Sequence, residues 1–226
     1  CQTGEFPAKA FNEVGYTHHQ VLGQGGGHHG VAIVSRHPIE TLEPQPLCRE
    51  GHARVQAARI EGFEIHNIYL PAGGDVPDPD ENDKFAHKLD FLASMARDYS
   101  ALASDASPRI LVGDLNVAPH ENDVWSHKQL LKIVSHTPVE VDHLGNAMEA
   151  GGWRDITRQD IPEGQLYSWW SYRARDWDTS DRGRRLDHVW VTAPLAGKVS
   201  GVDILKDARG WEKPSDHVPV IVDFDL

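Results

Sequence analysis

The stretch that decides the fold is RILVGDLN, residues 109–116. Its first half is the apolar, β-branched run of a buried strand, and Asp114 and Asn116 stand at the end of that strand. Two other stretches place a carboxylate beside a predicted strand: RLDH at 185–188, before a strand over 189–192, and SDHVP at 215–219, at the start of a strand over 218–224. Carboxylates, an amide and an imidazole at strand ends supply the ligands that a hard divalent cation needs. The three stretches therefore predict one metal-assisted site.

Predicted strands and helices alternate outward from these stretches. We expect a helix over 6–14, strands over 31–35, 53–60 and 63–70, and a tight hairpin at Glu61-Gly62 between the last two strands. A Pro-, Gly- and Asp-rich loop over 72–83 leads into an amphipathic helix with an apolar stripe at Phe85, Leu89, Leu92, Ala96, Tyr99 and Ala103. Hairpins mixed with helices predict an α/β fold: a four-layer sandwich of two facing mixed β-sheets flanked by helices, in one domain over 1–226.

Composition favours a water-soluble domain. The 226 residues are enough for one well-buried core, and the hydrophobic content of 39% and charged content of 25% are ordinary. No apolar run approaches the length of a membrane span, and the chain does not open with a secretion-signal pattern. Because Cys1 and Cys48 are the only cysteines, at most one disulfide can form within the chain, which favours a reducing, cytoplasmic setting.

The net charge opposes tight nonspecific binding to DNA. It is −12 at pH 7, whereas contacts with phosphates need lysine and arginine at the contact face. Five arginines nevertheless fall within residues 173–185, which allows a local basic patch on an acidic body. DNA is therefore not excluded as a substrate.

Read in order, the motifs resemble the endonuclease/exonuclease/phosphatase superfamily, which has the fold of deoxyribonuclease I. The resemblance is carried by GVAI at 30–33, NIYLP at 67–71, GDLNVAP at 113–119, YSWWSYR at 167–173, DRG at 181–183, LD at 186–187 and KPSDH at 213–217. The aromatic block at 167–173 favours the exonuclease III branch of apurinic/apyrimidinic endonucleases. This resemblance implies hydrolysis of DNA phosphodiesters in base-excision repair with Mg²⁺ or Mn²⁺, on the 5′ side of abasic sites and from 3′ ends.

The resemblance also implies roles for individual residues. Asp114 orients or deprotonates the attacking water, and Tyr69 hydrogen-bonds a phosphate oxygen. His217 contacts the scissile phosphate, while Asp187 fixes its tautomer and favours the imidazolium. The metal side of the site is formed by Asp114, Asn116, Asp216 and His217.

From the residues themselves, Asp114 and Asn116 lie two apart on an extended run, so both side chains leave the same face. Asn116 then hydrogen-bonds the water or the phosphate as a neutral donor. The competing interpretation of Asp-x-Asn is a turn or helix cap. Ser215, Asp216 and His217 cannot form a serine-hydrolase relay, since neighbouring side chains on an extended chain point apart.

The substrate side is assigned by resemblance to Trp169 and Arg173, with His29 at an aromatic position near the substrate. Trp170 fits a core strand equally well. We expect double-stranded DNA with abasic sites or 3′ ends as the partner, no membrane, and a monomer.

Two departures from the family pattern affect these expectations. The family's first strand and a metal-binding Glu are expected upstream of the first helix, so the chain is expected to lack them, and Glu5 does not replace that ligand. Arg184 stands where some relatives have an apolar residue, which bears on selectivity for abasic sites. Two alternatives stay open: a phosphodiesterase or phosphatase of the same superfamily for a small or lipid substrate, and a catalytically impaired DNA-binding fragment.

Overall fold

A mixed six-stranded sheet forms the centre of the protein. The computed structural model describes residues 6–24 and 30–226. The strand order is β3-β4-β5-β6-β8-β7, in which β5 and β6 are parallel and the other neighbours antiparallel. These strands are β3 (Glu40–Leu42), β4 (Val55–Ile60), β5 (Phe63–Ile68), β6 (Arg109–Asp114), β7 (Arg154–Asp155) and β8 (Asp187–Val191). The turn between β4 and β5 has positive φ at Glu61 and Gly62, 48° and 86°, which confirms the predicted tight hairpin.

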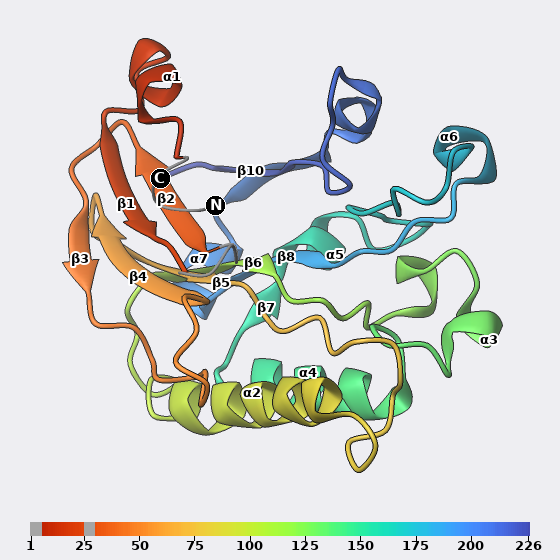
Figure 1. Ribbon diagram of the computed structural model, residues 1–226. Helices are drawn as coiled ribbons and strands as arrows, with labels where there is room; N and C mark the ends of the chain where they lie inside the picture. The colour runs from red at the N-terminus through yellow and green to blue at the C-terminus, as the bar shows by residue number, and fades with distance from the viewer. Residues whose placement is uncertain (1–5, 25–29) are drawn as a thin grey trace.

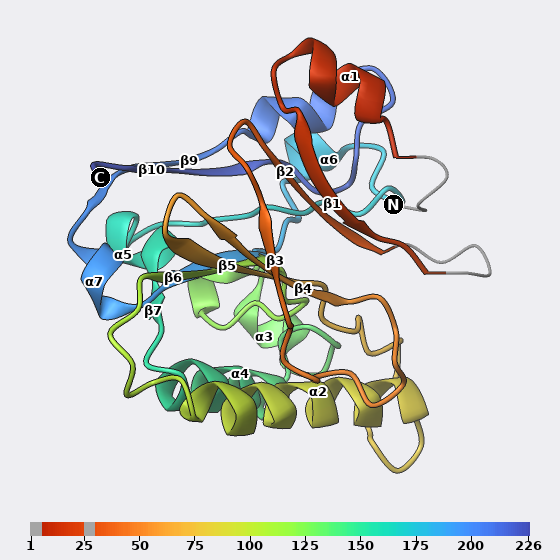
Figure 2. The same ribbon diagram turned by 90° about the vertical axis from the view of Figure 1, so that its left-hand side faces the viewer.

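Two two-stranded ribbons lie over one face of this sheet. One pairs β1 (His18–Leu22) with β2 (Val31–Ser35), and the other pairs β9 (Val199–Ile204) with β10 (Val220–Phe224). Figures 1 and 2 show both ribbons on the side of the sheet opposite to α2 and α4. The expected α/β sandwich is confirmed, with the second layer made of two separate ribbons instead of one continuous sheet.

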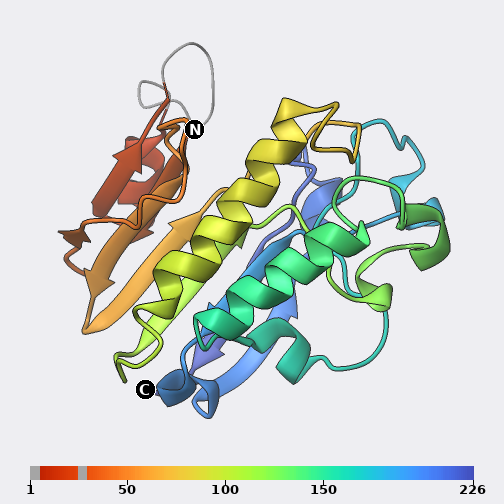
Figure 3. The ribbon, with the colours of Figure 1, turned by 90° about the horizontal axis from the view of Figure 1, so that it is seen from below.

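Two long helices cover the other face. They are α2 (Asp83–Ser100) and α4 (Pro138–Ala150), and they run side by side beneath the sheet (Figure 3). Asn82 caps α2 by accepting a hydrogen bond from the backbone N–H of Lys84, and Thr137 with Glu140 forms a capping box at the start of α4. The core between helices and sheet includes Phe91, Leu92, Met95, Tyr99, Leu111, Leu144 and Trp190.

The buried face of α2 is rotated from the predicted stripe. Phe85, Leu92 and Tyr99 are fully buried as expected, but Ala103 lies exposed beyond the end of the helix. Lys88 is also fully buried, and a polar residue of this kind is invisible to a search for apolar periodicity. The reason for its burial lies in the site described below.

Short helices form the remaining connections. They are α1 (Ala8–Glu13), α3 (His127–Leu130), α5 (Ile156–Asp160), α6 (Trp177–Ser180) and α7 (Ala193–Ala196), with 3-10 turns η2 (Glu121–Asp123) and η3 (Lys206–Gly210). Among the described helices, none is long and apolar enough to cross a bilayer.

Candidate active site

Strand register brings two carboxylates face to face at one end of the sheet. In the antiparallel pairing of β6 with β8, Asp114 lies directly opposite Asp187. Like charges in this position destabilise a sheet. Gly113 permits the arrangement, because a Cβ on this residue would lie 1.9 Å from the carbonyl oxygen of Ile68 on β5. The sequence thus brings two acids together at a structural cost.

His217 completes a compact cluster with these acids. Its Nδ1 donates to Asp187 Oδ2 at 2.8 Å, and its Nε2 lies 3.8 Å from Asp114 Oδ2. Ser168 Oγ also donates to Asp187 Oδ2, at 2.6 Å. One ligand atom from each of Asp114, Asp187 and His217 lies within 4.8 Å of the others. The structure therefore brings together three residues that are far apart in the chain.

The cluster has perturbed protonation equilibria. Burial and the charge of Asp187 raise the pKa of the Asp114 carboxyl to about 7. Burial alone would lower the pKa of His217, but its hydrogen bond to Asp187 and the charges of Asp187 and Asp114 outweigh burial and raise the pKa to about 9. At neutral pH the imidazole is therefore a cation with Nδ1 held by Asp187, and Asp114 is close to its midpoint.

Asn116 meets Asp114 through a turn instead of an extended run. Its φ is 51°, its backbone N–H donates to Asp114 Oδ1, and its Nδ2 donates to Asp114 Oδ2, both at 2.9 Å. Nδ2 also donates to the carbonyl oxygen of Leu70 at 2.9 Å. The prediction of an extended run was wrong, because this Asx turn follows the strand directly. Both amide N–H groups are engaged, so the polar atom left for a ligand is the acceptor Oδ1.

A buried ion pair fixes the position of this turn. Lys88 Nζ donates to the carbonyl oxygen of Asn116 at 2.8 Å and to a carboxylate oxygen of Glu140, and both charged side chains are fully buried. Glu140 also accepts from the backbone N–H groups of Ser135 and Thr137, at 2.9 and 3.1 Å. The pair links α2, α4 and the turn that carries Asn116, and sequence reasoning missed it.

A second buried network holds the segment that leads into β8. Arg185 donates from Nε and Nη2 to the two carboxylate oxygens of Asp123, both at 2.9 Å, and lies 2.8 Å from Asp155 Oδ2. Arg158 donates to the same Asp123 carboxylate at 2.6 and 2.9 Å. The network fixes the backbone around Asp187 and joins segments more than 60 positions apart. No local pattern in the sequence could have predicted it.

The other residues singled out in the sequence lie in different environments. Asp216 Oδ2 accepts from the Trp169 indole at 3.0 Å, so its carboxylate faces the aromatic block. Tyr69 is half-buried after β5 with the guanidinium of Arg54 over its ring at 4.9 Å, and burial raises the pKa of its phenol. Trp170 is 2% exposed and belongs to the core. His29 lies outside the described residues.

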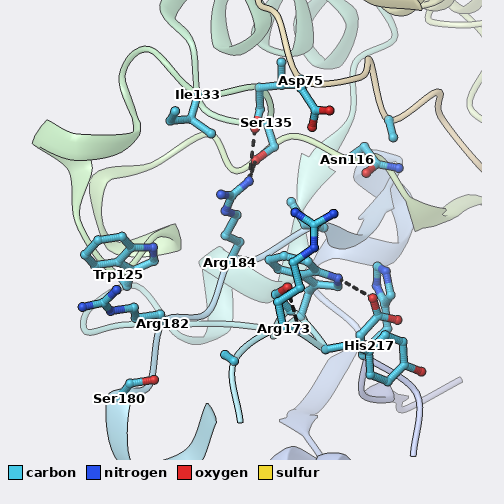
Figure 4. Close-up of a pocket in the computed structure, with 18 of the residues that line it drawn as sticks. Asp75, Asn116, Trp125, Ile133, Ser135, Arg173, Ser180, Arg182, Arg184 and His217 are labelled. Atoms are coloured by element: carbon cyan, nitrogen blue, oxygen red, sulfur yellow. Dashed lines mark hydrogen bonds between the residues drawn. The ribbon is translucent and has the colours of Figure 1, made fainter. Parts of the chain in front are cut away.

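A cavity of about 930 Å³ opens beside the cluster (Figure 4). Its lining includes Asn116, His217 and three arginines: Arg173, Arg182 and Arg184. Over the described ranges 6–24 and 30–226, no carboxylate oxygen lies within 4.0 Å of these three guanidinium groups. Three aspartates line the same cavity (Asp75, Asp176 and Asp216), so the arginines supply local positive charge without direct ion pairs in a protein of net charge −12. Figure 4 also shows Arg182 beside Trp125, 4.8 Å from its ring centre.

The donor set of the cluster suits a hard divalent cation. Burial and the facing carboxylate of Asp187 raise the pKa of Asp114, and an ion with a charge of +2 would offset this repulsion. The carboxylates of Asp114 and Asp216 and the Oδ1 of Asn116 are the oxygens that fit Mg²⁺ or Mn²⁺. His217 Nδ1 donates to Asp187, and Nε2 of the imidazolium also carries a proton, so the predicted metal-ligand role of His217 would require the neutral imidazole.

Comparison with known proteins agrees with this geometry. The model of the endonuclease/exonuclease/phosphatase family matches residues 2–217. The chain belongs to this family. It is 27% identical over 238 residues to exodeoxyribonuclease III of Haemophilus influenzae, covering 97% of the chain and 84% of that protein. The family and fold class predicted from the motifs are therefore confirmed.

Two solved structures of the family superpose closely on this chain. An AP endonuclease from Archaeoglobus fulgidus gives a TM-score of 0.91 at 28% identity, covering 100% of this chain and 86% of that one. A 3′ phosphatase from Neisseria bound to a product DNA hairpin gives 0.87, also at 28% identity and with the same coverage. These relatives are hydrolases of DNA, the class expected from the sequence.

Proposed function

We propose that this chain is a divalent-metal-dependent hydrolase of DNA phosphate esters that acts in base-excision repair, on the 5′ side of abasic sites and at 3′ ends. The observation that carries the proposal is the cluster of Asp114, Asp187 and His217 beside a cavity with three arginines that have no carboxylate partner among the described residues. A phosphate next to the cluster would meet the His217 imidazolium, and the arginines would attract the neighbouring DNA backbone. The names of the relatives support DNA as the substrate.

The residues divide the chemistry between them. Asp114, which belongs to the compact cluster with Asp187 and His217, accepts a proton from the attacking water. The water oxygen bonds to phosphorus, the bond from phosphorus to the leaving sugar oxygen breaks, and that oxygen takes up a proton from solvent. His217, held as a cation by Asp187, stabilises the charge that develops on the phosphate oxygens. The protonated phenol of Tyr69 donates a hydrogen bond to a further phosphate oxygen.

A bound Mg²⁺ or Mn²⁺ would polarise the phosphoryl oxygens and neutralise part of their charge. Asp114, Asn116 and Asp216 are the residues proposed to hold it. The proposed substrate contacts of Trp169 and Arg173 lie on the cavity wall beside this position. The proposal includes a single domain, a monomer and a cytoplasmic setting, the last from the two cysteines of the sequence.

A cleavage assay with matched substrates tests the proposed function. An end-labelled duplex with one abasic residue, the same duplex with an intact base, inositol phosphates and sphingomyelin are each incubated with Mg²⁺, and then with EDTA. We expect a product that ends 5′ of the abasic residue, its loss in EDTA, and no release from the small substrates. Release of phosphate or headgroup from the small substrates, with the abasic duplex left intact, would favour the superfamily's other phosphodiesterases and contradict the proposal. DNA binding without any metal-dependent product would make the chain a DNA-binding fragment.

A further inference from the structure

Two consecutive arginines near the site have opposite environments. Arg185 is fully buried, and its guanidinium is neutralised by the carboxylates of Asp123 and Asp155. Arg184 is half-buried, and its guanidinium reaches no carboxylate within ion-pair distance in the described part of the chain. The environment of Arg185 is that of a structural ion pair. The environment of Arg184 leaves a partly desolvated positive charge without a counter-charge.

The hydrogen bonds of Arg184 are incomplete as well. Nη1 donates to the carbonyl oxygen of Val134 at 3.1 Å and to Ser135 Oγ at 2.7 Å. Its Nε is buried and has no partner among the described residues. The guanidinium also lies over the ring of Trp169, 5.4 Å from the ring centre, which compensates part of the charge. A partly buried charge without a counter-charge is costly, and a ligand that brings negative charge would offset this cost.

No acid among residues 6–24 and 30–226 balances this charge directly. Glu140 is the acid whose charge acts on Arg184, but its oxygens are engaged by Lys88 and by two backbone N–H groups. Three aspartates line the same cavity, and none of them reaches the guanidinium within 4.0 Å: Asp75, Asp176 and Asp216. A negatively charged group on a ligand would therefore supply the counter-charge that Arg184 lacks.

The position of Arg184 in the cavity indicates which negatively charged group it binds. Its side chain lines the same cavity as Asn116 and His217, and Figure 4 shows it reaching toward Ser135 on the cavity wall. Its backbone pairs with Trp169, which in turn pairs with His217, so all three side chains leave adjacent segments. An abasic sugar is uncharged and would leave the cation unmatched. A phosphate next to the scissile one on the same strand would supply the missing negative charge.

We propose that Arg184 binds a second phosphate, adjacent to the scissile phosphate on the same DNA strand, and so selects substrates that carry charge at that position. The inference rests on the proposed function of the site. Two sources present this chemistry: a strand that continues past the cleavage point, and a terminal nucleotide that ends in a 3′-phosphate. In both, the recognised group is a phosphate oxyanion that accepts a hydrogen bond from Nη2, because Nη1 is engaged by Val134 and Ser135 and Nε is buried.

The test combines a modified substrate with a modified protein. In abasic duplexes, the phosphate on either side of the scissile one is replaced, one at a time, by an uncharged methylphosphonate. Dissociation constants are measured by anisotropy in EDTA, and kcat/KM is measured with Mg²⁺. For the native chain, we expect the methylphosphonate at one of the two positions to weaken binding and to lower kcat/KM by about 10- to 100-fold, the usual effect of losing a charged hydrogen bond. Arg184→Gln should show the same loss on the natural duplex and little further loss with the methylphosphonate.

Controls separate this role from a structural one. Arg184→Lys keeps the charge and should retain part of the binding that Arg184→Gln loses. Arg154→Gln removes an exposed arginine on the edge strand β7 and should leave the dissociation constants of all duplexes unchanged. Removal of one phosphate contact should also reduce the slope of log Kd against log salt by about 1 in Arg184→Gln and not in Arg154→Gln. Loss of folding would not change this slope selectively, and the methylphosphonate arm needs no variant.

A further arm distinguishes the two sources. Duplexes that end at the nucleotide after the scissile phosphate are compared with a 3′-phosphate and with a 3′-hydroxyl. A preference for the 3′-phosphate that disappears in Arg184→Gln identifies the terminal source, and a preference confined to continuing strands identifies the other. If the loss caused by the methylphosphonate and the loss caused by Arg184→Gln multiply when they are combined, the two groups do not contact each other and the inference is overturned. Cleavage of the abasic duplex would still support the proposed function in that case. Coupling in the binding assay with no cleavage of any DNA would overturn the proposed function alone.

Discussion

Substitution of Asp187 by Asn tests how the protein keeps His217 charged. Asp187 accepts from His217 Nδ1 at 2.8 Å, and this contact is the largest of the influences that raise the pKa of the imidazole from 6.5 to about 9. A rise of this size corresponds to about 3 kcal/mol of preference for the imidazolium. Asn has nearly the same shape but no charge, while burial still opposes the cation. We therefore expect the pKa of His217 to fall to 6.5 or below.

The consequence at about pH 7.5 can be estimated from these values. The native imidazole is almost entirely protonated, whereas a pKa of about 6.5 leaves about one tenth of the molecules in the cationic form. Because the amide introduced in Asp187→Asn can present either its oxygen or its nitrogen to Nδ1, the tautomer is less well fixed. Together these effects predict a decrease of kcat on an abasic duplex of about 10- to 100-fold.

Two measurements check this prediction. An NMR titration follows the His217 ring directly, and single-turnover cleavage with Mg²⁺ reports the chemical step. Asp203→Asn, which removes an exposed carboxylate from β9, is the matched control and should change neither quantity. If the ring in Asp187→Asn still titrates near pH 9, or if kcat stays within about twofold of the native value, the electrostatic reasoning is wrong.

Three further predictions concern the framework of the site. Lys88→Met leaves the buried Glu140 carboxylate without its cation. It should lower the free energy of unfolding, measured with urea, by about 3–5 kcal/mol. A loss below about 1 kcal/mol would contradict the assigned ion pair. Asp123→Asn removes the negative charge and one of the two acceptor oxygens that serve Arg158 and Arg185, and it should cost several kcal/mol in the same assay. A stability equal to that of the native chain would refute the network. Burial lowers the pKa of His66 and of His188 to about 4, so the unfolded chain binds more protons between pH 6.5 and 4. Stability is therefore present above about pH 6.5 and should fall as pH drops toward about 4, by up to about 3 kcal/mol per histidine, and thermal melts of His66→Gln should show a shallower fall.

The site residues that lie at the ends of apolar strands could be predicted from the sequence. Asp114 and Asp187 follow or begin apolar runs, so the strand ends could be placed from periodicity and composition alone. The meeting of these acids depends on the β6–β8 register, which the motifs imply only through the family resemblance. The turn at Asn116 was predicted as extended. Its positive φ accompanies hydrogen bonds to Asp114, two positions before it, and to Leu70, which lies 46 positions away and could not be paired with it from the sequence.

The residues that support the site were beyond sequence analysis. Lys88 interrupts the apolar stripe of a helix, and only its partner Glu140, 52 positions later, explains why a lysine is buried there. Arg184 and Arg185 are identical neighbours in sequence with different roles. Their difference arises from which carboxylates the tertiary structure brings within reach, and an isolated Arg-Arg pair contains no such information.

The central claim is that Asp114 and His217 act on the same phosphate. Single-turnover cleavage of an abasic duplex by Asp114→Asn, His217→Gln and the double variant tests it most directly, with Mg²⁺ at saturation and folding verified by circular dichroism. We predict that each single change lowers the rate by at least about 100-fold and that the double variant is slower than the worse single variant by less than about tenfold, since residues that act as a unit are not additive. Losses that multiply in full, or a His217→Gln variant with the native rate, would show that the two groups do not act at one centre.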